Sequence, residues 1–161
     1  MTMRRVRRQR TRLDWVLVAN AARARCFERD PENNALRELA GFVHPQSRLK
    51  GLALDDDRGG HALKGVASTQ YEPRTDSHAK EHAQFAREIA VFLDEGAIAH
   101  RFERLSLVAS SAFLGELRAH LGEPTRALLH ASVDRDLTSY AGAELERRVA
   151  QALATPSDGG Q

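Results

Sequence analysis

Apolar side chains occur along this chain in short runs and in helically spaced stripes, and turn-forming residues separate them. Short runs rich in β-branched and aromatic residues predict strands, whereas apolar positions three and four residues apart predict helices. On this basis we expect five strands, at 15–20, 24–30, 35–44, 104–110 and 126–134. The composition of 35–44 also suits a helix, but its position after the turn-forming residues of 30–34 favours a strand.

Three helices are expected, at 78–96, 112–122 and 142–153. In the first, Phe85, Ile89 and Leu93 form an apolar stripe at helical spacing, and Gly96 lies near the expected C-terminal end. Side chains that commonly cap helices precede the first two: Asp76 or Ser77, and Ser110 or Ser111.

The order of the elements predicts the fold class. Three antiparallel strands followed by two right-handed crossover connections build a mixed sheet with helices on its faces. We therefore predict a single α/β domain at 13–154 with a ribonuclease-H-like, mixed five-stranded sheet. The predicted loop at 44–77 is long enough to be either functional or disordered, and 155–161 is expected to be a disordered tail.

Composition narrows the class of protein. The chain has 161 residues, of which 42% are hydrophobic and 29% charged, as in an ordinary globular domain. No apolar run approaches the roughly 18 residues of a membrane span, so we expect no membrane partner. Cys26 is the only cysteine, which fits a small buried side chain in a reducing, cytoplasmic protein. No cofactor is expected.

The charge is divided unevenly along the chain. Of the 24 Lys and Arg residues, six lie in 1–12, which has no acid, and this leaves 18 against 22 Asp and Glu in the rest. Such a flexible basic arm can bind nucleic-acid phosphates, and the candidate contacts are Arg4, Arg5, Arg7 and Arg8. A solvated terminus or an organelle transit peptide would explain the same composition, whereas a secretory signal would need an apolar segment.

Several stretches together resemble a known bacterial family. They are "WVLVANAARARCFER", "GFVHPQSRLKG", "HAKEHAQFAREIAVFL", "RFERLSLVASSAFLGELR" and "SVDRDLTSYAGAELERRV". In this order they resemble the family called "protein required for attachment to host cells", over 15–153. The family name implies a role in host attachment, although no residue pattern here indicates an adhesin. Members usually carry an acidic residue after the first strand, where this chain has Asn20.

That family is similar to the middle domain of archaeal and eukaryotic peptide-chain release factors. In those factors the loop before the first long helix carries a Gly-Gly-Gln tripeptide that enters the ribosome. Gly59, Gly60 and His61 stand in the corresponding place here. The resemblance implies an association with the ribosome or RNA. Histidine cannot present the amide of glutamine, so we do not expect peptidyl-tRNA hydrolysis.

The same predicted loop contains basic side chains that can contact RNA phosphates. These are Arg48, Lys50, Arg58 and Lys64. A solvated loop explains their charges equally well.

Two motifs suggest metal chemistry. His78, Glu81 and His82 form the H-x-x-E-H pattern of inverted zinc peptidases, in which two imidazoles one helical turn apart hold the ion. The motif lies at the start of its predicted helix, and no third ligand is evident, although Glu95 and Glu144 are available. A polar first turn is the simpler interpretation.

The second motif is "DRDLT", where Asp134 and Asp136 follow the last strand. A nuclease of ribonuclease-H type needs acids at the ends of the first and fourth strands. Those positions hold Asn20 and the two serines at 110 and 111, so we favour a loop that leads into the last helix.

The sequence therefore predicts a non-enzymatic RNA-binding or ribosome-associated factor. Two alternatives stay open. One is a metal-dependent hydrolase that uses His78, Glu81 and His82. The other is a structural interaction module, such as a homodimer formed through a sheet edge.

Overall fold

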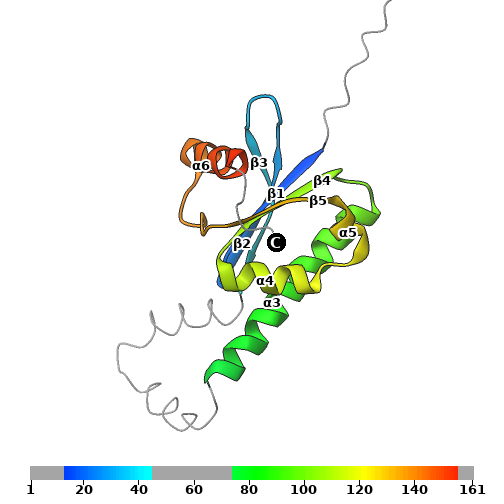
Figure 1. The fold of residues 1–161 in the computed structure, drawn as a ribbon, viewed down its shortest axis with the longest axis vertical. Helices are drawn as coiled ribbons and strands as arrows, with labels where there is room; N and C mark the ends of the chain where they lie inside the picture. The colour runs from blue at the N-terminus through cyan, green and yellow to red at the C-terminus, as the bar shows by residue number, and fades with distance from the viewer. Residues whose placement is uncertain (1–12, 45–73, 156–161) are drawn as a thin grey trace, which may run out of the picture.

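The computed structural model describes residues 13–44 and 74–155, and for 74–78 it describes the backbone only. Within these residues the order of elements is the predicted one with a short helix added (Figure 1). The elements are β1 (Asp14–Ala19), β2 (Arg23–Arg29), β3 (Leu36–Val43), α3 (Arg74–Ile98), β4 (Arg104–Ala109), α4 (Ser111–His120), α5 (Glu123–Leu128), β5 (Leu129–Asp134) and α6 (Gly142–Ala154).

The strands form one open mixed sheet in the order β3-β2-β1-β4-β5, which confirms the predicted mixed α/β class. β1 is antiparallel to β2 and parallel to β4, and β5 is parallel to β4. All six residues of β1 are buried, because the strand is central and both faces of the sheet are covered. The amino ends of β1, β4 and β5 therefore share one edge of the sheet, and their carboxyl ends share the opposite edge.

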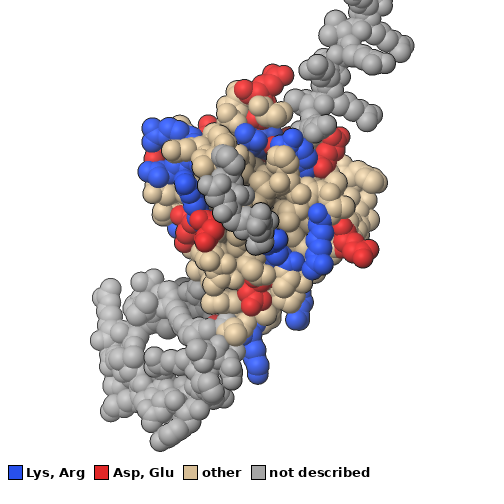
Figure 2. Space-filling model, viewed as in Figure 1, with Lys and Arg blue, Asp and Glu red and all other residues tan. Residues whose placement is uncertain are grey.

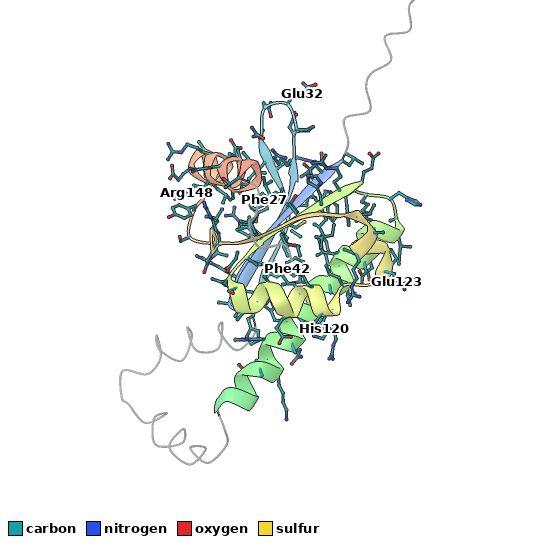
Figure 3. The ribbon with its side chains drawn as sticks, in the orientation of Figure 1. Phe27, Glu32, Phe42, His120, Glu123 and Arg148 are labelled. Carbon is teal, nitrogen blue, oxygen red and sulfur yellow. The ribbon has the colours of Figure 1, made fainter. Side chains whose placement is uncertain are left out.

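Alternation along the strands divides the core into two layers. Trp15 and Leu17 point to the face covered by α3 and α4, whereas Val16 and Val18 point to the face covered by α6. Figure 3 shows the same division, with Phe27 on the side of α6 and Phe42 on the side of α3 and α4. Only α6 and the segment before it cover the second face within the described residues.

The long helix α3 begins earlier than predicted. It starts at Arg74, so the capping position is neither Asp76 nor Ser77, and the last four residues of the predicted loop 44–77 are helical. Its buried stripe begins at Phe85 and contains Ile89 and Leu93, as the spacing predicted. The N-terminal part of α3 consequently extends beyond the sheet (Figure 1).

Gly96 does not end the helix. α3 continues to Ile98, and His100, with a φ of 56°, is the left-handed residue that follows it. A Cβ on Gly96 would lie 3.0 Å from the Trp15 ring and 3.1 Å from the Phe102 ring. The glycine is therefore needed for the close approach of two aromatic rings, and the helix ends at Ile98, two residues beyond the predicted end.

The short helix α5 was not predicted. The expected strand at 126–134 begins only at Leu129, because 126–128 belong to α5. Asp94 of α3 holds this helix by accepting hydrogen bonds from the Gly122 amide and the Thr125 hydroxyl. Ser110 stands at the predicted cap of α4 but makes no capping hydrogen bond with its side chain.

Cys26 is fully buried, as predicted for a small hydrophobic side chain. Burial raises the pKa of its thiol to about 12, so the reactive thiolate is scarce at neutral pH. Among the described helices, none has the length and apolar character required to cross a membrane.

Candidate functional site

All of the candidate RNA contacts lie outside the described residues. They belong to the segments 1–12 and 45–73. The residues concerned are Arg4, Arg5, Arg7, Arg8, Arg48, Lys50, Arg58, Gly59, Gly60, His61 and Lys64.

The described residues next to these two segments lie at opposite ends of the sheet. Leu13 precedes the amino end of β1. His44 lies near the carboxyl end of β1, because its amide donates to the Ala22 carbonyl at 2.9 Å and Ala22 follows that strand. Six residues of β1 separate the two points by about 20 Å. The two predicted contact regions therefore start from separate places on the body.

His44 joins the end of β3 to α3. It is 5% exposed, its Nε2 donates to the Glu81 carbonyl at 3.1 Å, and its ring meets the Phe85 ring edge-on at 5.2 Å. The hydrogen bond and the ring contact fix where the chain leaves β3 relative to α3.

The H-x-x-E-H motif lies on α3, one turn later in the helix than predicted, with half-buried Glu81 and His82. The side chain of His78 is outside the described part. Glu144, a suggested third ligand, is on α6 and pairs with Arg147 and Arg148 on the other side of the sheet from α3. The described residues include no group of three His, Cys, Asp or Glu side chains that could hold a metal ion.

A polar cluster closes the carboxyl ends of the parallel strands. We call Asn20, Asp136 and Thr138 the carboxyl-end cluster. Asn20 Nδ2 donates to Asp136 Oδ2 at 3.0 Å and to Thr138 Oγ1 at 2.9 Å. Asn20 Oδ1 accepts from the backbone amides of Ala22 and Arg23 at 2.8 and 2.9 Å. Every hydrogen-bonding position of this side-chain amide is thus used within the protein.

Asp136 also binds the segment that leads into α6. Its Oδ1 accepts from the Thr138 amide at 3.0 Å and from the Thr138 hydroxyl at 2.6 Å. Desolvation raises the pKa of Asp136, but hydrogen bonds from Thr138 and Asn20 and the charge of Arg23 together outweigh it, so the pKa lies below its ordinary value. The "DRDLT" segment therefore acts as a hydrogen-bonded connection in this structure.

A second polar cluster lies at the amino end of the same strands. We call Asp14, Arg29 and Arg104 the amino-end cluster. The Asp14 side chain is 2% exposed, and its Oδ2 is 3.0 Å from Arg29 Nη1 and 4.0 Å from Arg104 Nη2. Arg29 Nη2 donates to Asn34 Oδ1 at 2.6 Å. Asp14 Oδ1 and the Nε atoms of both arginines are buried and have no hydrogen-bond partner among the described residues.

A pocket of about 250 Å³ opens beside this cluster, between the sheet and the last turns of α6. Its polar lining comes from the strands β2, β4 and β5 and from the turn after β2, and its apolar lining comes from α6. The lining residues are Arg29, Asn34, Arg104, Ser106, His130, Ala150, Leu153 and Ala154.

Sequence reasoning missed the amino-end cluster. One signal was present, since Asp14 is a charged residue that directly precedes the apolar run of the first strand. The partners are 15 and 90 positions away, and only the pairing of β1 with β2 and β4 brings them together: Asp14 is opposite Arg29 in one register and opposite Arg104 in the other.

Comparison with family models matches residues 15–149 to the family described as "Protein required for attachment to host cells". Comparison with the curated proteins finds no match. The family match covers the whole carboxyl-end cluster, and it covers every described strand except the first residue of β1. That residue is Asp14, so only Arg29 and Arg104 of the amino-end cluster lie within the match. The chain therefore belongs to the family of proteins required for attachment to host cells.

Proposed function

We propose that this protein is a non-enzymatic, cytoplasmic RNA-binding factor that associates with the ribosome. The observation that carries the proposal is the division of charge, with six arginines and no acid in 1–12 against an acidic remainder. On the visible face of the described body, Lys and Arg are interspersed with Asp and Glu (Figure 2). Attraction to RNA phosphates would therefore come from the terminal segment and from basic residues within 45–73.

The strand order supports a ribonuclease-H-like layout related to the release-factor middle domain. If the two are related, the segment between β3 and α3 corresponds to the release-factor loop that enters the ribosome. His44 is buried at one boundary of this segment, and α3 extends beyond the sheet at the other. A folded domain that carries a long segment between two of its elements suits a binding factor.

The carboxyl-end cluster supports a non-enzymatic role. A carboxylate-dependent nuclease of this layout would need an acid where Asn20 stands, and the Asn20 amide instead holds Asp136 through a hydrogen bond of 3.0 Å. Because the carboxylate of Asp136 accepts this bond from within the protein, a structural role for Asp136 is favoured.

The separation of Leu13 and His44 indicates the size of ligand. Contacts from 1–12 and from 45–73 start about 20 Å apart along β1, so a ligand that meets both needs several phosphates over that length. A folded RNA provides such an array, and a mononucleotide does not.

Ribosome co-sedimentation tests the proposal. The intact chain, a version without residues 1–12, and a Gly59→Ala/Gly60→Ala version would be spun through sucrose gradients at low and moderate salt. Gly115→Ala is the matched control, because Gly115 is on α4 and a Cβ there meets nothing within 4 Å. We expect the intact chain and the control to travel with ribosomal particles and the double glycine variant to be lost from them.

Other results would change the proposal in defined ways. Binding that depends only on 1–12 and disappears at moderate salt would reduce it to non-specific electrostatic attraction. Absence of the intact chain from ribosomal fractions at both salt concentrations would overturn it.

A further inference from the structure

The walls of the pocket at the amino end of the sheet come from strands, a turn and the last helix. Its floor is the α6-facing side of the sheet, where Arg29 and Arg104 come from β2 and β4. Asn34 enters from the turn after β2 with a φ of 61°, a left-handed conformation that asparagine adopts more readily than most residues. Its backbone amide donates to the Asp30 carbonyl at 2.8 Å. Arg29 is thereby held between Asp14 and Asn34, and its guanidinium cannot swing freely into solvent.

Positive charge exceeds negative charge at this place. Two guanidinium groups face one carboxylate, and Asp14 lies closer to Arg29, at 3.0 Å, than to Arg104, at 4.0 Å. No acidic side chain belongs to the described lining of the pocket. One full positive charge, mostly that of Arg104, therefore has no close counter-charge among the described residues.

Buried hydrogen-bond donors are also in excess. The Nε atoms of Arg29 and Arg104 are both buried without a described partner. Native proteins rarely leave such donors unpaired, so water or a ligand has to satisfy them. A volume of about 250 Å³ is several times the roughly 30 Å³ that one water occupies, which leaves room for a tetrahedral oxyanion.

The last turn of α6 opposes an anion, because its free carbonyl groups carry about half an elementary negative charge. After the carboxylate of Asp14 is counted, the two arginines carry a net charge of one positive unit, which is larger than this half charge. A cation would meet two guanidinium groups instead. The balance of charge consequently favours an anion.

From these contacts we infer that the pocket binds a phosphate group of a small ligand. Arg104 would be its main contact, with Arg29 and the imidazole of His130 beside it. These three side chains come from three strands of one sheet and together offer more than two N–H donors, which suits the several oxygens of a tetrahedral phosphate better than the two of a planar carboxylate. The inference is independent of the proposed RNA binding, because the pocket lies in the described body and not in 1–12 or 45–73.

Inorganic phosphate is the probe for the test. The full-length chain, labelled with ¹⁵N, would be titrated at constant ionic strength while amide chemical shifts are followed. We expect saturable shifts at Arg29, Asn34, Arg104 and His130. Arg104→Gln should weaken phosphate binding roughly tenfold or more, as expected for the loss of one charge-assisted hydrogen bond. Arg37→Gln is the matched control, since Arg37 pairs with Glu28 on the surface and is 72% exposed, and it should bind like the unchanged chain.

His130→Gln is a second variant on an exposed position, so it can decide the matter even if Arg104→Gln fails to fold. We expect it to weaken phosphate binding several-fold. Shifts confined to amides of 1–12, equal binding by His130→Gln and Arg37→Gln, or no saturable shift at millimolar phosphate would each overturn the inference.

Discussion

The two ends of the parallel strands carry polar clusters of opposite character. At the carboxyl end, Asn20 donates two hydrogen bonds and accepts two, and both oxygens of Asp136 accept at least one. At the amino end, three polar atoms of Asp14, Arg29 and Arg104 are buried and have no described partner. The same sheet therefore ends in one saturated cluster and one unsaturated cluster.

This difference separates a structural role from a binding role. A cluster whose hydrogen-bonding positions are filled, such as the one around Asn20, gains little from a ligand, because a ligand would have to replace hydrogen bonds that already exist. An unsaturated cluster with excess charge gains both hydrogen bonds and a counter-charge when an anion enters. The amino end, which carries no sequence motif, is therefore the better candidate for a ligand within the described residues.

The largest expected effect on stability comes from replacing Arg29, the arginine that pairs with Asp14 at the amino end. Arg29→Met should lower the free energy of unfolding by about 3 kcal/mol, because it leaves the carboxylate of Asp14 buried without its 3.0 Å partner. Chemical denaturation of the full-length protein measures the change. Arg37→Met, on the surface of the adjacent strand, should cost less than about 0.5 kcal/mol.

A double-mutant cycle with Asp14→Asn sharpens this result. If the pair is coupled, Asp14→Asn/Arg29→Met should be more stable than the sum of the two single changes predicts. Simple additivity would show that Arg29 stabilises the fold through contacts other than the ion pair.

The next largest effect on stability is expected from replacing Asn20 in the carboxyl-end cluster. Asn20→Asp should lower the free energy of unfolding by about 2 kcal/mol at neutral pH, because it removes two donated hydrogen bonds and brings a second carboxylate to within about 3 Å of Asp136. The loss should shrink as the pH falls and one carboxyl becomes protonated. Thermal unfolding at neutral and acid pH tests both parts.

Asn33→Asp is the matched control. Asn33 is exposed in the turn after β2, and its Oδ1 accepts from the Ala35 amide at 2.9 Å, a bond that a carboxylate also accepts. We expect a change within about 0.5 kcal/mol. An equal loss in both variants would mean that added charge alone, and not the hydrogen bonds of Asn20, causes the effect.

The arrangement of elements was predictable because local patterns specify it. The buried run of β1 and the stripe of Phe85, Ile89 and Leu93 each bury the face that the alternation or helical spacing indicated. The errors arose where tertiary contacts override local chemistry. Gly96 looked like a helix end, but its hydrogen faces Trp15 and Phe102, and no local rule reveals which glycine approaches a ring.

The candidate site was less predictable for a similar reason. Asn20 was recognised as standing where an acid was expected, yet its link to Asp136 spans 116 positions and depends on where the chain after β5 returns. Arg29 and Arg104 belong to no motif in the sequence. Only the registers of β1 with β2 and β4 show that both arginines lie opposite Asp14 and form a cluster with it.

A smaller effect should appear in the pH dependence of stability. The pKa of Asp136 is lower in the folded protein than its ordinary value of 3.8, so the unfolded chain binds more protons in acid. The contribution of Asp136 to the stability of the fold is therefore complete above its ordinary pKa. This contribution is lost as the pH falls through the lower pKa of the folded protein. Asp136→Asn should flatten that acid limb and change stability at neutral pH by no more than about 1 kcal/mol, since the side chain is exposed. An unchanged acid limb would show that Asp136 is not held by Asn20 and Thr138 in solution.

The smallest effect on stability is expected from replacing Arg104. This replacement tests most directly whether the amino end of the sheet differs in role from the carboxyl end. Its guanidinium is 4.0 Å from Asp14 and its side chain is 31% exposed, so Arg104→Gln should change the free energy of unfolding by less than about 1 kcal/mol. Denaturation in buffer without phosphate measures this value. A loss as large as that of Arg29→Met would make Arg104 a structural partner of Asp14, and both ends of the sheet would then be structural. A small loss together with weakened phosphate binding would instead mean that Arg104 serves a ligand rather than the fold, because a buried donor that contributes little to stability has no other described use.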